Sequence, residues 1–179
     1  MQRNGNSLEP IAPSKLSWRE FDSGFLPGKM NELLEAMKAP FSAADFALPG
    51  MGLLGLKKKY PKIAGECSGC FVLIENGKPV YVGMSRKVYK RLFFLLKQAR
   101  DYTSTLADML AHDKVPLEGC WYDKMQTPGF KAAYEEAKER MKRMQVAVVE
   151  VKGDMELYIF AAYCAQHLKI PMINLFRLN

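Results

Sequence analysis

An apolar run passes directly into a glycine, a serine and basic residues in the stretch VYVGMSR, residues 80–86. A glycine at the end of a strand lets the backbone approach an anion closely, and a helix that begins just beyond it presents unpaired amides and a positive dipole end. Arg91 is suited to a bidentate pair with a phosphate, and Tyr81 is suited to orient or deprotonate water. These residue types at this spacing indicate chemistry on a phosphodiester.

Positive charge continues beyond this stretch. From Met84 to Arg100 there are six Lys or Arg and no acid, and the whole chain has a formal net charge of +7. Such an excess favours polyanionic partners. The run has two interpretations, a solvated helix face or a face that binds phosphates. Under the second interpretation Arg86, Lys87 and Lys90 contact the nucleic-acid backbone.

The elements that must position these residues predict an α+β fold. CFVLIE and PVYVG form a hairpin around Asn76-Gly77, a sequence that favours a tight two-residue turn. After Ser85, which is suited to cap a helix, apolar residues recur at helical spacing. The other predicted elements are helices at 104–112, 130–144 and 155–168, a loop at 115–129 and a strand at 145–151, with Asp154 as the cap of the last helix. The expected core is a small antiparallel sheet, the hairpin plus a third strand, packed with helices.

The chain divides near residue 66. Residues 1–66 open with a polar arm, contain a helix around GKMNELLEAMK and end in the basic LKKKYPK. Several Gly and Pro residues interrupt regular structure in the second half of this segment. We expect it to be an extension with at least one helix that packs on a core domain formed by residues 67–179.

Taken together, the motifs resemble the GIY-YIG nuclease family. The likeness covers roughly residues 67–175 and rests on Gly69-Cys70-Phe71, Tyr81-Val82-Gly83, Ser85, Arg91 and the terminal PMIN with Asn174. It implies a metal-dependent endonuclease that hydrolyses phosphodiester bonds, with DNA favoured over RNA as the substrate and Mg²⁺ or Mn²⁺ as the cofactor. In that activity Tyr81 positions or activates water, Arg91 holds the phosphate and Asn174 braces the site.

The resemblance is incomplete at three positions. Phe71 stands where the family has its first tyrosine, and it keeps the ring without the hydroxyl. Leu95 stands where many relatives have a histidine or tyrosine. Ala161 occupies the position of the metal-binding glutamate. Glu156 lies five residues earlier on the same helix and so points about 140° away, and Glu150 at a strand end is a weak substitute.

Two functions follow from this pattern. The first is an endonuclease that lacks its metal-binding glutamate because of a Glu to Ala change, engineered or natural. The second is a catalytically degenerate module that binds nucleic acid or a protein without cutting.

Hairpin geometry gives one test of the resemblance. A plain two-residue turn pairs Glu75 with Lys78 and sends Phe71 and Tyr81 to opposite faces, because side chains alternate along a strand. Both rings face one pocket only if the hairpin contains a bulge. Pro79, which has no amide to donate, favours such an irregularity.

The cysteines and the apolar segments of the chain indicate its compartment and bear on zinc and membrane binding. Four cysteines and a polar start predict free thiols in a reducing cytoplasm. CSGC at 67–70 has no second pair at zinc-site spacing, so coincidence is favoured over a zinc site. FALPGMGLLGL is too short and too broken by Gly and Pro to span a bilayer, so no membrane partner is expected.

Overall fold

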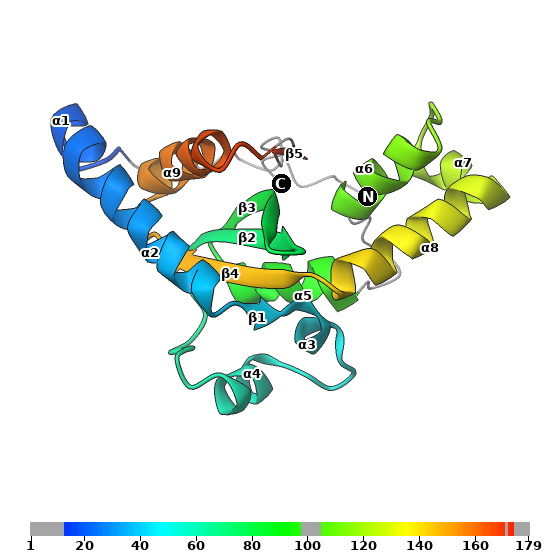
Figure 1. Ribbon diagram of the computed structural model, residues 1–179, viewed down its shortest axis with the longest axis horizontal. Helices are drawn as coiled ribbons and strands as arrows, with labels where there is room; N and C mark the ends of the chain where they lie inside the picture. Colours follow the sequence, from blue (N-terminus) through cyan, green and yellow to red (C-terminus); the bar gives the residue numbers. More distant parts are fainter. Residues whose placement is uncertain (1–12, 98–104, 171, 174–179) are drawn as a thin grey trace, which may run out of the picture.

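The computed structural model describes residues 13–97, 105–170 and 172–173. These residues form an α+β fold around a five-stranded sheet with strand order β1-β4-β2-β3-β5 (Figure 1). The strands are β1 (Phe41–Ser42), β2 (Gly69–Glu75), β3 (Lys78–Ser85), β4 (Gln145–Glu150) and β5 (Met172–Ile173). Neighbouring strands are antiparallel, except that β5 runs parallel to β3. The hairpin and third strand are as predicted, whereas the two-residue edge strands are too short to carry a pattern.

The helices follow most of the predicted ranges. They are α1 (Trp18–Glu20), a π-helical turn η1 (Phe21–Phe25), α2 (Leu26–Lys38), α3 (Ala43–Ala47), α4 (Leu53–Lys59), α5 (Val88–Lys97), α6 (Thr105–Lys114), α7 (Trp121–Gln126), α8 (Pro128–Lys142) and α9 (Asp154–His167). The prediction of a loop over 115–129 was wrong, since it contains α7. Trp121 of this helix packs edge-on against Tyr134 of α8, a contact that the local sequence does not reveal.

Each face of the sheet has its own helical layer and hydrophobic cluster. Alternate residues of β2 enter different clusters: Phe71 and Leu73 enter one, and Cys70 and Val72 enter the other. Helices α3, α5, α6 and α8 contribute to the first cluster, and α2 and α9 to the second. Figure 1 shows α2 and α9 on one side of the sheet and α3 and α5 on the other. We refer to these as the α5 side and the α9 side.

Residues 13–66 contribute to both sides. Leu33 of α2 is buried on the α9 side, and Phe46 of α3 is buried on the α5 side. Between these helices β1 extends the sheet by pairing Phe41 with Val146 of β4. Helix α4 follows and lies at the lower end of the molecule (Figure 1).

The hairpin has the predicted turn and a bulge. Asn76 and Gly77 both have positive φ, 51° and 75°, as a tight turn that matches strand twist requires. Glu75 pairs with Lys78, but the register then shifts, so that Leu73 lies opposite Tyr81 and Val80 is the extra residue. The bulge restores Phe71 and Tyr81 to the same face of the sheet.

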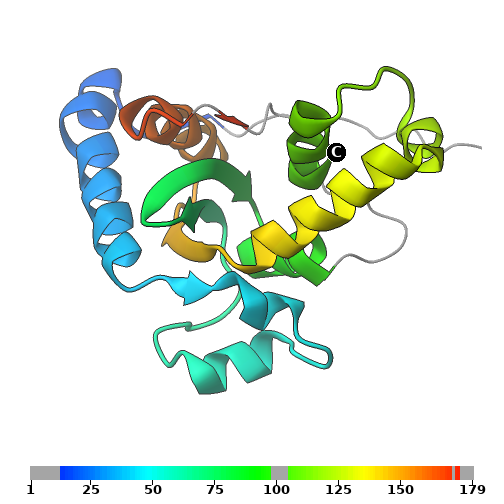
Figure 2. The ribbon, with the colours of Figure 1, turned by 45° about the vertical axis from the view of Figure 1, so that its right-hand side comes forward.

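A helical arm extends from the α5 side. Helix α6 packs along α8, and α7 packs against the same helix (Figure 2). Two hydrogen bonds from Arg140 of α8 to the Glu75 carboxylate, 2.7 and 2.6 Å long, tie the arm to the hairpin. Within the described residues, no helix is both long and apolar enough to cross a membrane.

Candidate nucleic-acid interface

Strand β3 does not end at the glycine of the YVG motif, because it continues to Ser85. Gly83 lies opposite Phe71 on β2, and the ring of Phe71 covers it. A Cβ atom at residue 83 would lie 2.3 Å from Cζ of Phe71, a distance that non-bonded atoms do not reach. The glycine therefore makes room for an internal ring, and the expectation that it admits a phosphate is corrected.

The amides at the start of α5 are already bonded within the chain. Glu66 accepts hydrogen bonds from the amides of Tyr89 (2.8 Å) and Lys90 (2.9 Å), one with each carboxylate oxygen. The Val88 amide donates to the carbonyl of Cys67, and the Lys87 amide donates to the hydroxyl of Ser85. The predicted anion site with unpaired amides is therefore filled by the chain's own carboxylate. Glu66 lies more than twenty residues before these amides, so no local spacing pattern indicates it.

Three of the predicted catalytic residues do lie together. The ring centroids of Phe71 and Tyr81 are 6.1 Å apart. Burial raises the pKa of Tyr81 to about 12, although the nearby charge of Arg91 acts in the opposite direction. Tyr81 is 1% exposed. At neutral pH its hydroxyl is protonated and shielded from bulk water, which does not suit a group that deprotonates water.

The predicted metal position lies elsewhere. Ala161 on α9 is 4% exposed and packs in the cluster on the α9 side, whereas Tyr81 packs on the α5 side. A glutamate at residue 161 could hold a metal ion only beside an open, polar cleft, and the close packing of α9 against the sheet leaves no such opening at Ala161. Of the two substitutes, Glu156 accepts a 2.6 Å hydrogen bond from the hydroxyl of Ser14, and Glu150 is exposed at the end of β4.

The donor set does not fit a metal ion. Across the described parts of the chain, no group of three His, Cys, Asp or Glu is arranged to hold one. Cys67 and Cys70 of the CSGC motif pack against different clusters, on opposite sides of the sheet. Asn174, the predicted brace of the site, lies outside the described residues.

Arg86, predicted to contact nucleic acid, is held by a carboxylate. Its guanidinium donates to both oxygens of Asp154, at 3.0 and 2.6 Å. The pair links the end of β3 to the start of α9. Asp154 was predicted to cap α9, but Gly153 is the N-cap residue and Asp154 occupies the first turn. The other two predicted contacts, Lys87 and Lys90, are both exposed.

Exposed lysines extend from α5 to α4 and form what we call the lysine surface. Its members are Lys57, Lys58, Lys62, Lys87, Lys90 and Lys97. The ammonium of Lys97 donates to the carbonyl of Met51, just before α4, so the end of α5 adjoins the start of α4. The ammonium of Lys62 lies 4.5 Å from the ring centroid of Phe41, which also contacts Tyr89 of α5. The six lysines therefore belong to adjoining elements.

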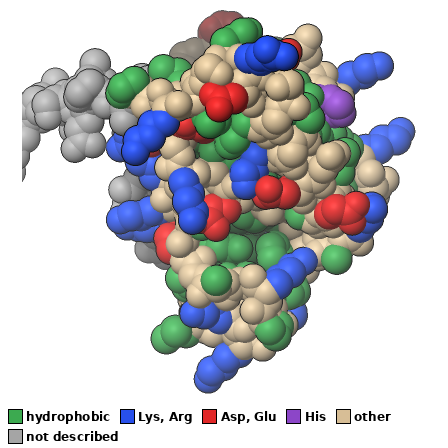
Figure 3. Space-filling view, turned by 90° about the vertical axis from the view of Figure 1, so that its left-hand side faces the viewer, with side chains coloured by type: hydrophobic (Ala, Val, Ile, Leu, Met, Phe, Trp, Pro, Cys, Tyr) green, Lys and Arg blue, Asp and Glu red, His purple; other side chains and the backbone are tan. Residues whose placement is uncertain are grey.

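The chain's excess charge is concentrated in this region. Between Met51 and Lys97 there are ten Lys or Arg but only two acids, Glu66 and Glu75. None of the six lysines forms an ion pair with a described acidic residue. On the face drawn in Figure 3, acidic and basic side chains are mixed across the middle, whereas the lower end, formed by α4, shows basic side chains without acidic ones.

One further lysine of α4 has a structural partner. Lys59 donates to one oxygen of the buried Asp45 at 2.6 Å, and Tyr60 donates to the other. Burial opposes the charged form of Asp45, but these hydrogen bonds outweigh it, so the pKa of Asp45 is lowered. The pair fixes α4 against α3 and thereby positions Lys57 and Lys58.

No family model, no curated protein and no solved structure matches this chain.

Proposed function

We propose that this chain is a nucleic-acid-binding module that holds a phosphate backbone on the lysine surface and does not hydrolyse it. The observation that carries the proposal is the concentration of ten basic residues against two acids between Met51 and Lys97. Six of these residues are exposed lysines on adjoining elements, and none has a described acidic partner. Exposed ammonium groups without an acidic partner exchange their mobile counterions for phosphates when nucleic acid binds. This exchange is the main source of affinity for a nucleic-acid backbone.

The two acids close to the lysine surface, Asp45 and Glu66, are compatible with phosphate binding there. Asp45 is buried beneath α4 and neutralised by Lys59. The carboxylate of Glu66 is engaged by two backbone amides. Both acids therefore have partners inside the chain, and neither competes for the ammonium groups of the lysine surface.

The endonuclease implied by the family resemblance is the second candidate. In its favour, the bulge at Val80 gives Phe71 and Tyr81 the shared face that the resemblance requires. Against it, Tyr81 is buried, and residue 161 is an alanine on the other side of the sheet. Among the described residues, no group of three His, Cys, Asp or Glu could hold the Mg²⁺ or Mn²⁺ ion that this activity needs. Binding without cleavage is therefore the better supported function.

One experiment separates the two candidates. Anisotropy of a fluorescent oligonucleotide measures binding at about 50 and 200 mM salt, and a plasmid-nicking assay with Mg²⁺ or Mn²⁺ measures cleavage. If six lysines each replace a counterion, affinity for a single strand should fall by roughly a few hundredfold between these salt concentrations. Binding with this salt dependence and no nicking is the expected result. Metal-dependent nicking would restore the endonuclease, and absence of binding at low salt would overturn both.

A further inference from the structure

Two members of the lysine surface are each held by an aromatic ring and a backbone carbonyl. The ammonium of Lys62 lies 4.5 Å from the ring centroid of Phe41 and donates to the carbonyl of Ala39. The ammonium of Lys97 lies 4.8 Å from the ring centroid of Phe93 and donates to a carbonyl just before α4. A ring face and a carbonyl oxygen attract an ammonium group without cancelling its charge. Both lysines are therefore held in place and keep their charge for an anion.

Lys90 has the same kind of neighbour on the solvent side of α5. Its ammonium lies 5.7 Å from the ring centroid of Phe94, the residue four positions later in the helix. Residues four apart lie on one face of a helix, so the ring is beside the lysine side chain. Phe94 is 41% exposed, and it therefore holds Lys90 at the surface. Three of the six lysines thus have a ring as a partner.

The rings that hold these lysines are joined through the core. Phe41 of β1 contacts Phe46 of α3, with ring centroids 6.5 Å apart, and Phe46 contacts Phe93 of α5 at 5.5 Å. Phe46 is fully buried, and side chains in a close-packed core keep one position. Phe94 follows Phe93 on the same helix. The ammonium groups on these rings therefore keep a fixed spacing, although they come from different elements.

The side chains that read base edges are few in this region and are engaged elsewhere. Base recognition in the grooves relies chiefly on Arg for guanine and on Asn or Gln for adenine. Residues 51–97 contain no Gln, two Arg and one Asn. Arg86 is held by its ion pair, and Arg91 is half-buried. Asn76 lies in the hairpin turn, at the opposite end of β3 from α5. The surface therefore offers contacts to phosphates and few to bases.

We infer that the lysine surface binds double-helical nucleic acid of any sequence, through ammonium groups that aromatic rings hold at fixed positions. The inference rests on the proposed function, since it assigns the form of nucleic acid that the same surface takes. A duplex presents phosphates at fixed positions and carries about twice the charge per length of one strand. A flexible single strand must first be ordered to match fixed ammonium groups, and this ordering costs entropy. Proteins that bind single strands offset that cost with rings that stack on bases, whereas the rings here hold lysines.

Two other polyanions fit the lysine surface less well. An acidic protein offers carboxylates on flexible side chains, and an anionic membrane offers headgroups that diffuse past one another. Neither presents negative groups at a fixed spacing, so neither gains much from ammonium groups that are already held in place. The phosphates of a double helix have such a spacing, and they match the whole array.

The first part of the test compares a DNA duplex with oligothymidylate of the same length, which forms no internal pairs. Fluorescence anisotropy at about 0.1 M salt should show the duplex bound about tenfold tighter or more, since each neutralised phosphate contributes more to the salt slope on a duplex than on a single strand. Duplexes of A·T-rich and G·C-rich sequence should differ in affinity by less than about twofold, because phosphate contacts carry no sequence information.

The second part asks whether a ring acts through its lysine. Phe94→Leu keeps apolar bulk without a ring face and should weaken duplex binding by roughly two- to fivefold, which corresponds to about 0.5–1 kcal/mol for an exposed cation–π contact. The salt slope should not change, because no charge is removed. Phe94→Tyr should restore the affinity. In a chain that already carries Lys90→Ala, Phe94→Leu should have no further effect, because the contact between the two side chains is already absent.

A matched substitution controls for the loss of an exposed ring in general. Tyr122→Leu removes a ring that is 67% exposed on α7, in the helical arm, and should leave duplex affinity unchanged. Urea denaturation of each variant checks that binding is measured on folded protein.

Failure of the inference is distinguishable from failure of the proposed function. Equal or tighter binding of oligothymidylate, or a strong preference for one duplex sequence, would overturn the inference and leave backbone binding in place. An undiminished effect of Phe94→Leu in the Lys90→Ala chain would show that the ring does not act through Lys90, and this too would overturn the inference alone. Absence of binding to both nucleic acids, with binding to anionic vesicles or to polyglutamate, would overturn both proposals.

Discussion

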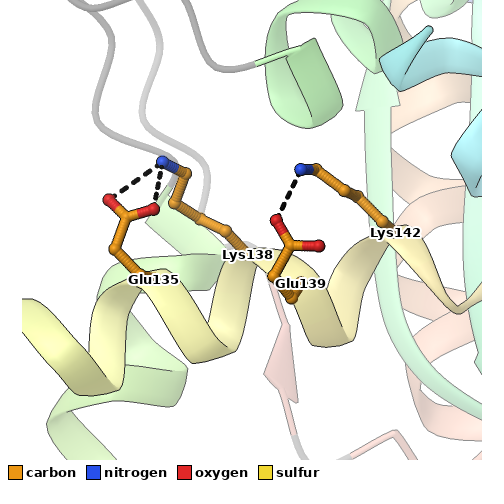
Figure 4. Close-up of polar contacts among 4 residues, drawn as sticks. All are labelled: Glu135, Lys138, Glu139 and Lys142. Carbon is orange, nitrogen blue, oxygen red and sulfur yellow. Dashed lines mark hydrogen bonds and ion pairs between the residues drawn. The ribbon is translucent and has the colours of Figure 1, made fainter.

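Helices α5 and α8 pack on the same side of the sheet, and both contain lysines at the molecular surface, yet these lysines have different neighbours. On α8, Lys138 pairs with Glu135 at 2.8 Å and Lys142 pairs with Glu139 at 2.6 Å (Figure 4). On α5 the exposed lysines have no described acidic partner. Each α8 pair joins residues three apart on the helix surface, where such pairs stabilise the helix itself.

Lysines therefore have different roles on the two helices: those of α8 stabilise the helix, and those of α5 remain available to a polyanion. The arm formed by α6, α7 and α8 is nearly balanced in charge, and residues 105–150 contain seven Lys or Arg and eight acids. A balanced surface has little long-range attraction for a polyanion, whereas an unbalanced one attracts it strongly at low salt. Exposed lysines therefore identify a binding face only where the acids are missing. Four experiments test this comparison, from the largest expected effect to the smallest.

The largest effect is expected at residue 161, where the family resemblance implies a metal-binding glutamate. Ala161→Glu places a carboxylate in the closed cluster on the α9 side, and it should lower the free energy of unfolding by about 3 kcal/mol or more. Urea denaturation measures this loss. The matched control is Ala162→Glu, at an exposed neighbouring position, which should change stability by no more than about 0.5 kcal/mol. A stable Ala161→Glu variant that nicks DNA with Mg²⁺ would move the site to the α9 side.

Removing lysines from α5 and from α8 tests the comparison directly. The triple variant Lys87→Ala, Lys90→Ala, Lys97→Ala should reduce the salt slope for oligothymidylate by about two, which at about 0.1 M salt corresponds to roughly a hundredfold loss of affinity. The triple variant Lys131→Ala, Lys138→Ala, Lys142→Ala removes the same charge from α8 and should lose no more than about twofold. Equal losses would mean that net charge, and not the lysine surface, governs binding.

Lys59 differs from the paired lysines of α8, because its partner Asp45 is buried. Asp45→Asn should lower stability by about 1–3 kcal/mol, because Lys59 and Tyr60 lose a charged acceptor. The folded pKa of Asp45 is lowered, so its contribution is present above the unfolded value of about 3.9 and is lost as the pH falls through the folded value. Urea denaturation across this pH range should show the difference between the two proteins shrinking in acid. The matched control is Asp22→Asn, at an exposed position, which should change stability at neutral pH by no more than about 0.5 kcal/mol.

The exposed pairs of α8 should contribute least. Glu135→Gln and Glu139→Gln each remove one partner of a solvent-exposed pair, and each should lower stability by no more than about 0.5 kcal/mol. Raising the salt concentration should reduce even this difference, because exposed charges are screened. Thermal unfolding at low and high salt measures it. A loss above about 1 kcal/mol would contradict the expectation that these pairs within α8 add little to stability.

Local patterns predicted most of the fold. Asn76-Gly77 specified the turn, because few residue pairs adopt positive φ at both positions, and Pro79 indicated the bulge that follows. The apolar stripe of α5 also appears as predicted, with Val88 and Leu92 both buried. Several short elements were not predicted, because each depends on contacts with distant segments: α1, η1, α3, α4, α7, β1 and β5.

The candidate site was less predictable than the fold. The family resemblance implied that Phe71, Tyr81 and Arg91 lie in one site, and these three residues are close together in the structure. Their exposure depends on which helices cover them, and that cannot be obtained from spacing along the chain. The partners of the charged groups are equally non-local. Arg86 binds Asp154, 68 residues away, and this contact removes Arg86 from the set of unpaired cations.

The sequence by itself determined where positive charge accumulates, because the count between Met51 and Lys97 does not depend on folding. Only the tertiary structure decided which of these charges remain unpaired. A carboxylate neutralises an ammonium group across a few ångströms, and the fold alone brings Asp45 to Lys59 while leaving Lys90 without an acidic partner among the described residues. The tertiary structure likewise decided that Phe93 is partly buried against Phe46 of α3, whereas the next residue, Phe94, is 41% exposed.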